Sequence, residues 1–201
     1  MRDRDLVRLY WPADLRPAFD ALLDIDEAMA VVVSRSTQPA LAAIKLAWWR
    51  ERLGELDEGK VPAELRLQAA AEQLLSRGVK GSDLARLEDG WASLLDEQPD
   101  PVRVGRRGVA LFEIGAKLLG AAVNDDVAGA ARLFASVDVA RRGLAQFASK
   151  EFDLSGLAID RPLRPLTALA ALAARGPLEQ EATPGRAWAL LRHRFTGRFA
   201  R

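Results

Sequence analysis

Residues 39–56 read PALAAIKLAWWRERLGEL, and this stretch decides the fold class. Its apolar side chains recur at steps of three and four residues, which is the spacing of an α-helix and not of a β-strand. These side chains are Leu41, Ile44, Trp48, Trp49, Leu53 and Leu56. Because they cover so much of the helix circumference, we expect this helix to be buried on more than one side, inside a bundle.

Helical spacing continues on both sides of this stretch, and no segment alternates in the manner of a β-strand. We expect further helices, bounded by proline, glycine or capping residues, over about 14–34, 62–76, 82–95, 109–123, 127–147, 166–174 and 183–197. The stretch 150–165 is predicted to be irregular. Since no repeat or linker interrupts the pattern, residues 1–201 are predicted to form one all-α helical bundle, with about seven to nine helices.

The composition excludes several classes of function. The 29 basic and 28 acidic residues nearly balance, so no nucleic-acid partner is expected. Cysteine is absent, which excludes disulfides and thiolate sites and fits a reducing cytoplasm. The single histidine, His193, leaves no basis for a histidine-rich metal site.

The apolar runs are far shorter than the roughly 20 residues that cross a bilayer, and the charged N-terminal sequence lacks the apolar core of a signal peptide. We therefore expect a cytoplasmic protein with no transmembrane segment. A peripheral position at the inner membrane face is compatible with this expectation.

Three acidic residues share one face of the first long predicted helix. Asp20, Asp24 and Glu27 follow one another at steps of four and three residues. Such a group can hold Mg²⁺, because this cation takes one or two carboxylates together with the phosphates of a substrate. The same spacing is also typical of a solvated acidic face, or of salt bridges to neighbouring helices.

Two cations lie among the apolar residues of the helix over 39–56. Lys45 and Arg52 must find an anion if they are buried, because an unpaired buried charge is very costly. Acidic residues of the preceding helix could pair with them, or they could contact an anionic group such as a diphosphate in a cavity. Trp48 and Trp49 beside them would then line that cavity, or would simply pack in the core.

The C-terminal region contains an arginine cluster without acidic neighbours. Its members are Arg186, Arg192, Arg194, Arg198 and Arg201. This cluster predicts either a solvated helix face or a contact for phosphates or for an anionic membrane surface.

Four segments of the chain resemble the squalene/phytoene synthase family: 39–53, with the Trp-Trp-Arg-Glu block, 61–64, 164–170 and 190–198. The last two are similar to the tail of short bacterial members. The resemblance implies the all-α isoprenoid-synthase fold. It also implies, for active members, a prenyl transferase that condenses two prenyl diphosphates head to head with Mg²⁺ held by two aspartate-rich helical motifs.

The sequence departs from the family at both motifs. The first motif is expected near residues 30–34, where this chain reads Ala-Val-Val-Val-Ser. The helix of the second motif, between Phe147 and Pro165, is largely deleted, and the chain is shorter than the active enzymes. Negative diphosphates need cations to bind and to leave, and these departures remove the residues that would hold them.

Two functions follow from the resemblance and its departures. The first is a degenerate, non-catalytic member without a cofactor, which binds a prenyl lipid or acts, like a divergent branch of the family, in assembling a respiratory membrane complex. The alternative is an active Mg²⁺-dependent prenyl transferase of isoprenoid biosynthesis with a displaced site. In that case Asp20, Asp24 and Glu27 would bind Mg²⁺, and Lys45 and Arg52 would contact the diphosphate in the same cavity. A purely structural helical module would have no apolar cavity.

Overall fold

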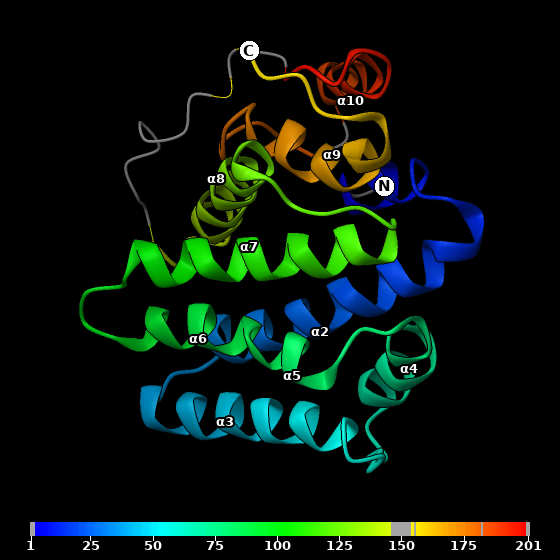
Figure 1. Cartoon of the computed structure of the whole chain (residues 1–201). Helices are drawn as coiled ribbons and strands as arrows, with labels where there is room; N and C mark the ends of the chain where they lie inside the picture. Colours follow the sequence, from blue (N-terminus) through cyan, green and yellow to red (C-terminus); the bar gives the residue numbers. More distant parts are fainter. Residues whose placement is uncertain (1–2, 146–153, 155, 182, 200–201) are drawn as a thin grey trace.

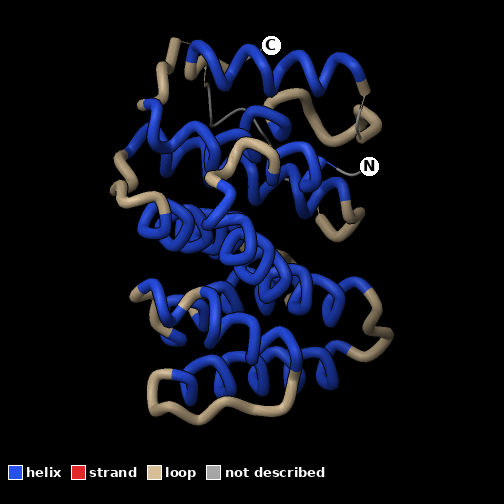
Figure 2. Tube along the Cα trace, turned by 90° about the vertical axis from the view of Figure 1, so that its right-hand side faces the viewer, coloured by secondary structure: helices blue, strands red, loops and turns tan. Residues whose placement is uncertain are grey.

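The computed structural model describes residues 3–145, 154, 156–181 and 183–199. Within these ranges the chain forms helices and loops without any strand, which confirms the predicted all-α class (Figure 2). The α-helices are α1 (Asp3–Arg8), α2 (Arg16–Ser34), α3 (Pro39–Leu56), α4 (Leu65–Gln73), α5 (Gly81–Ala85), α6 (Leu87–Ala92), α7 (Pro101–Leu118), α8 (Asp125–Arg141), α9 (Arg164–Ala173) and α10 (Pro184–Thr196). The 3-10 helices are η1 (Ala13–Leu15), η2 (Leu75–Arg77), η3 (Ser93–Leu95) and η5 (Arg161–Leu163).

The helices are stacked in layers. Figure 1 shows α3 at one end, followed by α5 and α6, then α7, α8 and α9, and finally α10 at the other end. Helix α2 runs beside this stack and contacts α3, α4, α6 and α7. One cluster of buried apolar side chains joins these layers. Among the described residues, no helix combines the length and the apolar character that crossing a lipid bilayer requires.

Helix α3 has the predicted bounds but not the predicted position. It packs on α2, α5 and α6 through residues such as Leu46 and Leu53, while its opposite side faces solvent. Leu41, Ile44 and Trp48 are 45%, 67% and 40% exposed. The expectation that this helix is buried on more than one side is therefore wrong. Its apolar residues do encircle the helix, but all neighbouring helices reach it from one side.

The C-terminal helix begins and ends as predicted. The Thr183 side chain accepts a hydrogen bond from the Arg186 amide at 3.3 Å, and Pro184 occupies the first helical position. Gly197 ends the helix in the left-handed region with φ of 71°, a conformation that glycine adopts at little cost. The capping pattern of this segment is therefore a reliable guide to its bounds.

Other boundaries differ from the predictions. Helix α7 begins at Pro101, well before the predicted residue 109, because Asp100 caps it by accepting a hydrogen bond from the Val102 amide at 2.8 Å. Helix α8 begins at Asp125, two residues before the predicted residue 127, because the Asn124 side chain caps it by accepting a hydrogen bond from the Val127 amide at 3.0 Å. The predicted helix over 82–95 is divided into α5, α6 and η3. The predicted end of the helix over 127–147 and much of the irregular stretch 150–165 lie outside the described residues.

Glycines allow α7 to approach both α6 and α8 closely. A methyl group at Gly108 would collide with the carbonyl oxygen of Ala131 on α8. A methyl group at Gly90 of α6 would collide with the side chain of Arg107 on α7. This close approach places the residue that precedes Gly108 on α7, the buried Arg107, between α6 and α8.

Candidate functional site

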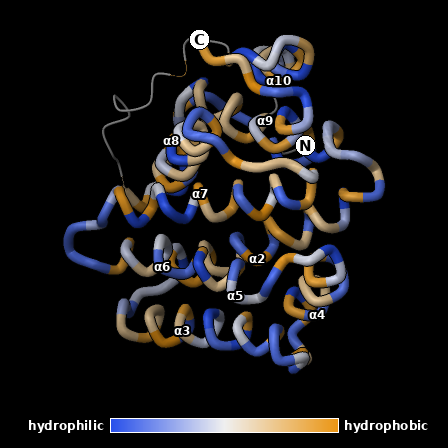
Figure 3. The backbone as a smooth tube through the Cα atoms, viewed as in Figure 1, coloured by the Kyte–Doolittle hydropathy of each residue, from blue (hydrophilic) through white to orange (hydrophobic). Residues whose placement is uncertain are grey.

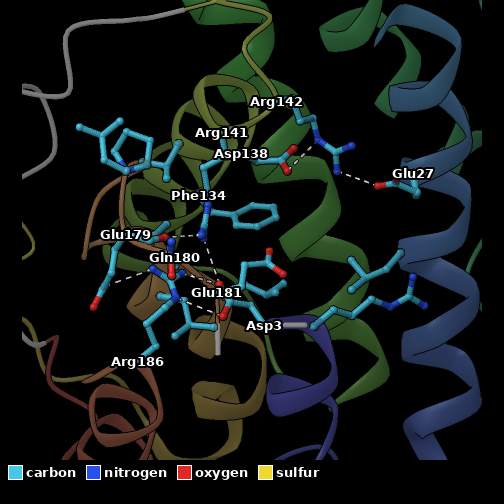
Figure 4. A pocket seen from close by; sticks show the side chains of 18 of the residues that line it. Asp3, Glu27, Phe134, Asp138, Arg141, Arg142, Glu179, Gln180, Glu181 and Arg186 are labelled. Carbon is cyan, nitrogen blue, oxygen red and sulfur yellow. Dashed lines mark hydrogen bonds and ion pairs between the residues drawn. The ribbon is translucent and has the colours of Figure 1, made fainter. Parts of the chain in front are cut away.

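A cavity of about 610 Å³ lies between α1, α2, α8, α9 and the loop that precedes α10 (Figure 4). This volume falls within the range of roughly 300–1,000 Å³ that is usual for small-molecule sites. Helices α2, α8 and α9 supply apolar side chains to its lining, namely Leu23, Phe134, Val137, Leu169 and Leu172. The same lining also contains many charged side chains, several of them from α2 and α8. We therefore take it as the candidate binding site.

A buried ion network forms the polar wall of the cavity. Asp138 of α8 accepts hydrogen bonds from Arg107 Nη2 at 2.7 Å and from Arg142 Nε at 3.0 Å. Asp26 of α2 accepts a hydrogen bond from Trp91 Nε1 at 2.8 Å, and Arg107 Nε lies 3.7 Å from its carboxylate. Four helices, α2, α6, α7 and α8, therefore meet through charged groups and a buried indole N–H, and not only through apolar contacts.

The pKa values of the two buried carboxylates of this network are shifted in opposite directions. Burial raises the pKa of Asp26, although the nearby Arg107 acts in the other direction. Burial opposes ionisation of Asp138 too, but Arg107 and Arg142 outweigh it and hold the pKa of Asp138 below its ordinary value. For Arg142, burial favours the neutral form, yet Asp138 and Glu27 raise its pKa above the ordinary value. The Asp138–Arg142 pair is therefore charged at neutral pH.

A second charged cluster lies at the mouth of the cavity. Asp3 of α1 pairs with Arg141 Nη1 at 3.0 Å and with Arg186 Nε at 3.1 Å. Glu179 pairs with Arg186 Nη1 at 3.3 Å (Figure 4). It also pairs with Arg175 Nε at 2.6 Å. A hydrogen bond from Arg175 lowers the pKa of Glu179. This cluster fastens the first and last helices to the loop that borders the cavity.

The three predicted metal ligands on α2 are each paired with an arginine. Asp20 lies 2.6 Å from Arg8 Nε, and Asp24 lies 2.7 Å from Arg4 Nη1. Glu27 lies 2.7 Å from Arg142 Nη2 and is the one member of the three that lines the cavity. Within the described ranges, no group of three or more His, Cys, Asp or Glu residues is placed to hold a metal ion. Of the readings that the sequence left open, the structure shows salt bridges to neighbouring elements.

The predicted residues of α3 lie elsewhere. Arg52 pairs within its own helix, with Nη1 2.9 Å from Glu55, and Lys45 is exposed. Trp49 is buried in the core, and its ring meets that of Trp48 edge to face at 5.2 Å. None of the four residues lines the cavity. The structure therefore does not bring the acids of α2 and the cations of α3 together.

The C-terminal arginine cluster is not one continuous surface. Arg186 is fully buried and belongs to the charged cluster at the cavity mouth, so its assignment to a solvated face or a surface contact is wrong. Arg192, Arg194 and Arg198 are exposed, and Arg201 lies outside the described residues. The burial of Arg186 could not be predicted from the sequence, because its partner Asp3 lies 183 residues away along the chain.

Sequence reasoning missed the buried network. Asp26 follows Leu22 by four residues and precedes Met29 by three, so it falls on the apolar stripe of α2. Arg107 occupies the same kind of position between Val104 and Leu111 on α7. A charged residue on a core-facing stripe is the signal that could have identified them, because such a residue needs a buried partner.

The described lining of the cavity contains carboxylates, guanidinium groups and one amide, but no hydroxyl, thiol, imidazole or amine. Its nucleophiles and bases are therefore limited to carboxylates, and all but Glu181 of these are paired or hydrogen-bonded. The arrangement suits binding of a molecule with an apolar part and a polar head. Comparison with protein-family models, with curated proteins and with solved structures finds no match, so the family resemblance stays a prediction.

Proposed function

We propose that this protein is a non-catalytic, squalene/phytoene-synthase-like protein that binds a prenyl lipid in the cavity between α2, α8 and α9. The observation that carries the proposal is the composition of the cavity lining. It combines apolar side chains suited to an isoprenoid chain with charged groups, most of which are already paired with one another. A purely structural module would need no such cavity.

The salt bridges argue against Mg²⁺-diphosphate chemistry at this site. A metal would have to displace Arg4 from Asp24, Arg8 from Asp20 and Arg142 from Glu27, and each of these contacts is 2.7 Å or shorter. Charge-assisted pairs of this length are among the stronger polar contacts in proteins. The alternative, an active prenyl transferase with a displaced site, therefore requires these three pairs to break together.

The location and partners of the protein follow from the same proposal. A cytoplasmic protein at the inner face of the membrane would meet prenyl lipids there. Assembly of a respiratory membrane complex, the other role that the resemblance implies, is a second proposal that fits a protein that binds such a lipid without turning it over.

Binding and catalysis can be measured with the same probes. We expect farnesol and farnesyl diphosphate to bind the full chain in calorimetry, and we expect no pyrophosphate release from farnesyl or geranylgeranyl diphosphate with Mg²⁺. The Asp24→Asn variant should bind both probes as the wild type does. Pyrophosphate release at an enzyme-like rate that Asp24→Asn abolishes would establish the alternative activity instead.

A matched pair of variants tests the cavity itself. Leu178 lines the cavity mouth and is almost fully exposed, so Leu178→Glu changes the site at little cost in stability. Leu65, an exposed leucine on α4, does not line the cavity and provides the control Leu65→Glu. We expect about tenfold weaker farnesol binding for Leu178→Glu alone, because a carboxylate is unfavourable beside an apolar chain. Equal binding by both variants would place the lipid elsewhere.

A further inference from the structure

Helix α10 presents an apolar ridge to solvent. Trp188, Leu191 and Phe195 are 66%, 39% and 73% exposed. With successive residues about 100° apart around a helix, the three fall within an arc of about 60°. The arc lies opposite the buried side chains of this helix, Arg186, Ala189, Leu190 and His193, which face the body of the protein. The ridge is therefore the outermost line of the helix and not the margin of a packed face.

Arginines flank this ridge. Arg192 lies on one side of it and Arg194 on the other, and Arg198 follows directly after the helix. Residues 183–199 contain no acidic side chain, and none of these three arginines forms a salt bridge among the described residues. Figure 3 shows hydrophobic and strongly hydrophilic residues side by side along α10. Arg194 lies over the Tyr10 ring, with Cζ 5.0 Å from the ring centroid, but no carboxylate within the described part of the chain neutralises either cationic flank of the ridge.

A basic cavity opens beside the C-terminal half of α10. It has a volume of about 460 Å³ and is lined by Arg161, Arg164 and Arg194, together with Tyr10 and Phe195. Arg164 donates hydrogen bonds to the last carbonyl groups of α10, whereas no carboxylate pairs with Arg161 or Arg194 within the described residues. No acidic residue lines this cavity. Phe195 borders both the cavity and the ridge, so the two form one surface.

The charges of this surface decide what covers it. A second copy of the chain related by twofold symmetry would bring the arginines of one α10 against those of the other, which is unfavourable. An anionic bilayer offers the complementary arrangement, with phosphates for the arginines and an apolar interior for the ridge. Tryptophan is also a residue that favours the level of lipid headgroups. Because α10 is already folded and capped, docking requires no ordering of the helix.

We propose that α10 docks the protein on an anionic phospholipid bilayer. Trp188, Leu191 and Phe195 enter the headgroup region, while Arg192 and Arg194 contact lipid phosphates on either side. The basic cavity beside Phe195 receives one headgroup phosphate through Arg161 and Arg194. This inference stands on the surface of α10 and is independent of ligand binding between α2, α8 and α9.

Vesicle co-sedimentation of the full chain tests the proposal. We expect binding to vesicles of phosphatidylcholine mixed with phosphatidylglycerol, and about tenfold weaker binding to phosphatidylcholine alone. Raising the NaCl concentration from about 0.1 M to about 0.5 M should weaken the binding, because salt screens the arginines. Absence of binding to the mixed vesicles, or equal binding to both kinds, would overturn the proposal.

Variants at opposite ends of the molecule locate the contact. We expect Trp188→Ala/Phe195→Ala and Arg192→Gln/Arg194→Gln each to reduce vesicle binding about tenfold. The control Ile44→Ala/Trp48→Ala removes a similar exposed apolar pair from α3, and it should bind as the wild type does. Equal losses from the α3 and α10 variants would overturn the proposal. So would a dimer, detected by sedimentation without lipid, that Trp188→Ala/Phe195→Ala converts to monomer.

Farnesol binding without vesicles separates this proposal from the proposed function. The α10 variants should bind farnesol normally, and Leu178→Glu should bind vesicles normally. Each proposal can then fail while the other stands.

Discussion

The guanidinium group of Arg107 lies over the indole ring of Trp91, with its Cζ atom 3.9 Å from the ring centroid. Both side chains are fully buried, and the same Arg107 pairs with Asp138 on the next helix. A stacked guanidinium retains a favourable contact where water is excluded, which helps to offset the cost of burying its charge. This contact joins α6 and α7 to the wall of the candidate site.

Replacement of this buried arginine should be strongly destabilising. Arg107→Leu would leave Asp26 and Asp138 buried without their shared cation, at a cost of about 3–5 kcal/mol. The control Arg103→Leu lies one turn earlier on α7, where the arginine pairs with the exposed Asp89, and it should cost no more than about 1 kcal/mol. Urea unfolding measures both free energies. Similar costs for the two variants would contradict the buried network.

The single histidine should stay neutral far below its usual titration range. His193 Nε2 lies 2.9 Å from Thr167 Oγ1 and Nδ1 lies 3.2 Å from the Arg198 carbonyl oxygen, and burial lowers the pKa of His193 to about 4. Because the sequence contains one histidine, its NMR signal needs no assignment. We expect that signal to titrate near pH 4. In the control Arg192→His, the added exposed histidine should titrate near its ordinary value of about 6.5.

The same pKa difference should make stability depend on pH. The unfolded chain has a histidine pKa of about 6.5, so between about pH 6.5 and 4 it binds more protons than the folded protein. The contribution of His193 is therefore complete above about pH 6.5 and should fall by about 3 kcal/mol as the pH approaches 4. Urea unfolding at a series of pH values would reveal this loss. A His193 signal that titrates above pH 6 would contradict both expectations.

Two glycines on facing helices should respond in opposite ways to alanine. Gly108→Ala forces a methyl group against the Ala131 carbonyl oxygen, and we expect a loss of about 1–3 kcal/mol. Gly129 lies on α8 in open space, so Gly129→Ala should raise the free energy of unfolding by up to about 1 kcal/mol. Thermal unfolding of the two variants gives both signs in one experiment. A stabilising Gly108→Ala would show that α7 and α8 are less close than described.

Magnesium alone should not bind to the acidic face of α2. Asp20, Asp24 and Glu27 each hold an arginine, so we expect no heat in a Mg²⁺ titration and no increase in the melting temperature. The Arg4→Ala/Arg8→Ala variant frees Asp20 and Asp24 and is the positive control, since it should give weak binding. Tight binding of Mg²⁺ by the wild type would favour the transferase alternative.

The sequence was sufficient to predict what depends on local chemistry. The fold class, the bounds of α3 and the caps of α10 all follow from apolar spacing and from residues such as Thr183 and Gly197. The position of α3 could not be predicted, because apolar spacing does not say how many neighbours reach a helix. The candidate site depends on pairs far apart in the chain, such as Asp26 with Trp91 and Asp3 with Arg186, and no local pattern specifies such partners.

Gly108 stands beside Arg107, and this adjacency couples the spacing of two helices to the charge balance of the cavity. The missing side chain at Gly108 sets the distance between α7 and α8, and that distance brings Asp138 within 2.7 Å of Arg107. A substitution at Gly108 would therefore weaken the contact between Arg107 and Asp138, and so alter the charge balance of the cavity wall, without replacing any residue that lines the cavity. If the proposed lipid binds in this cavity, its affinity should then depend on residues such as Gly108 that do not line the cavity.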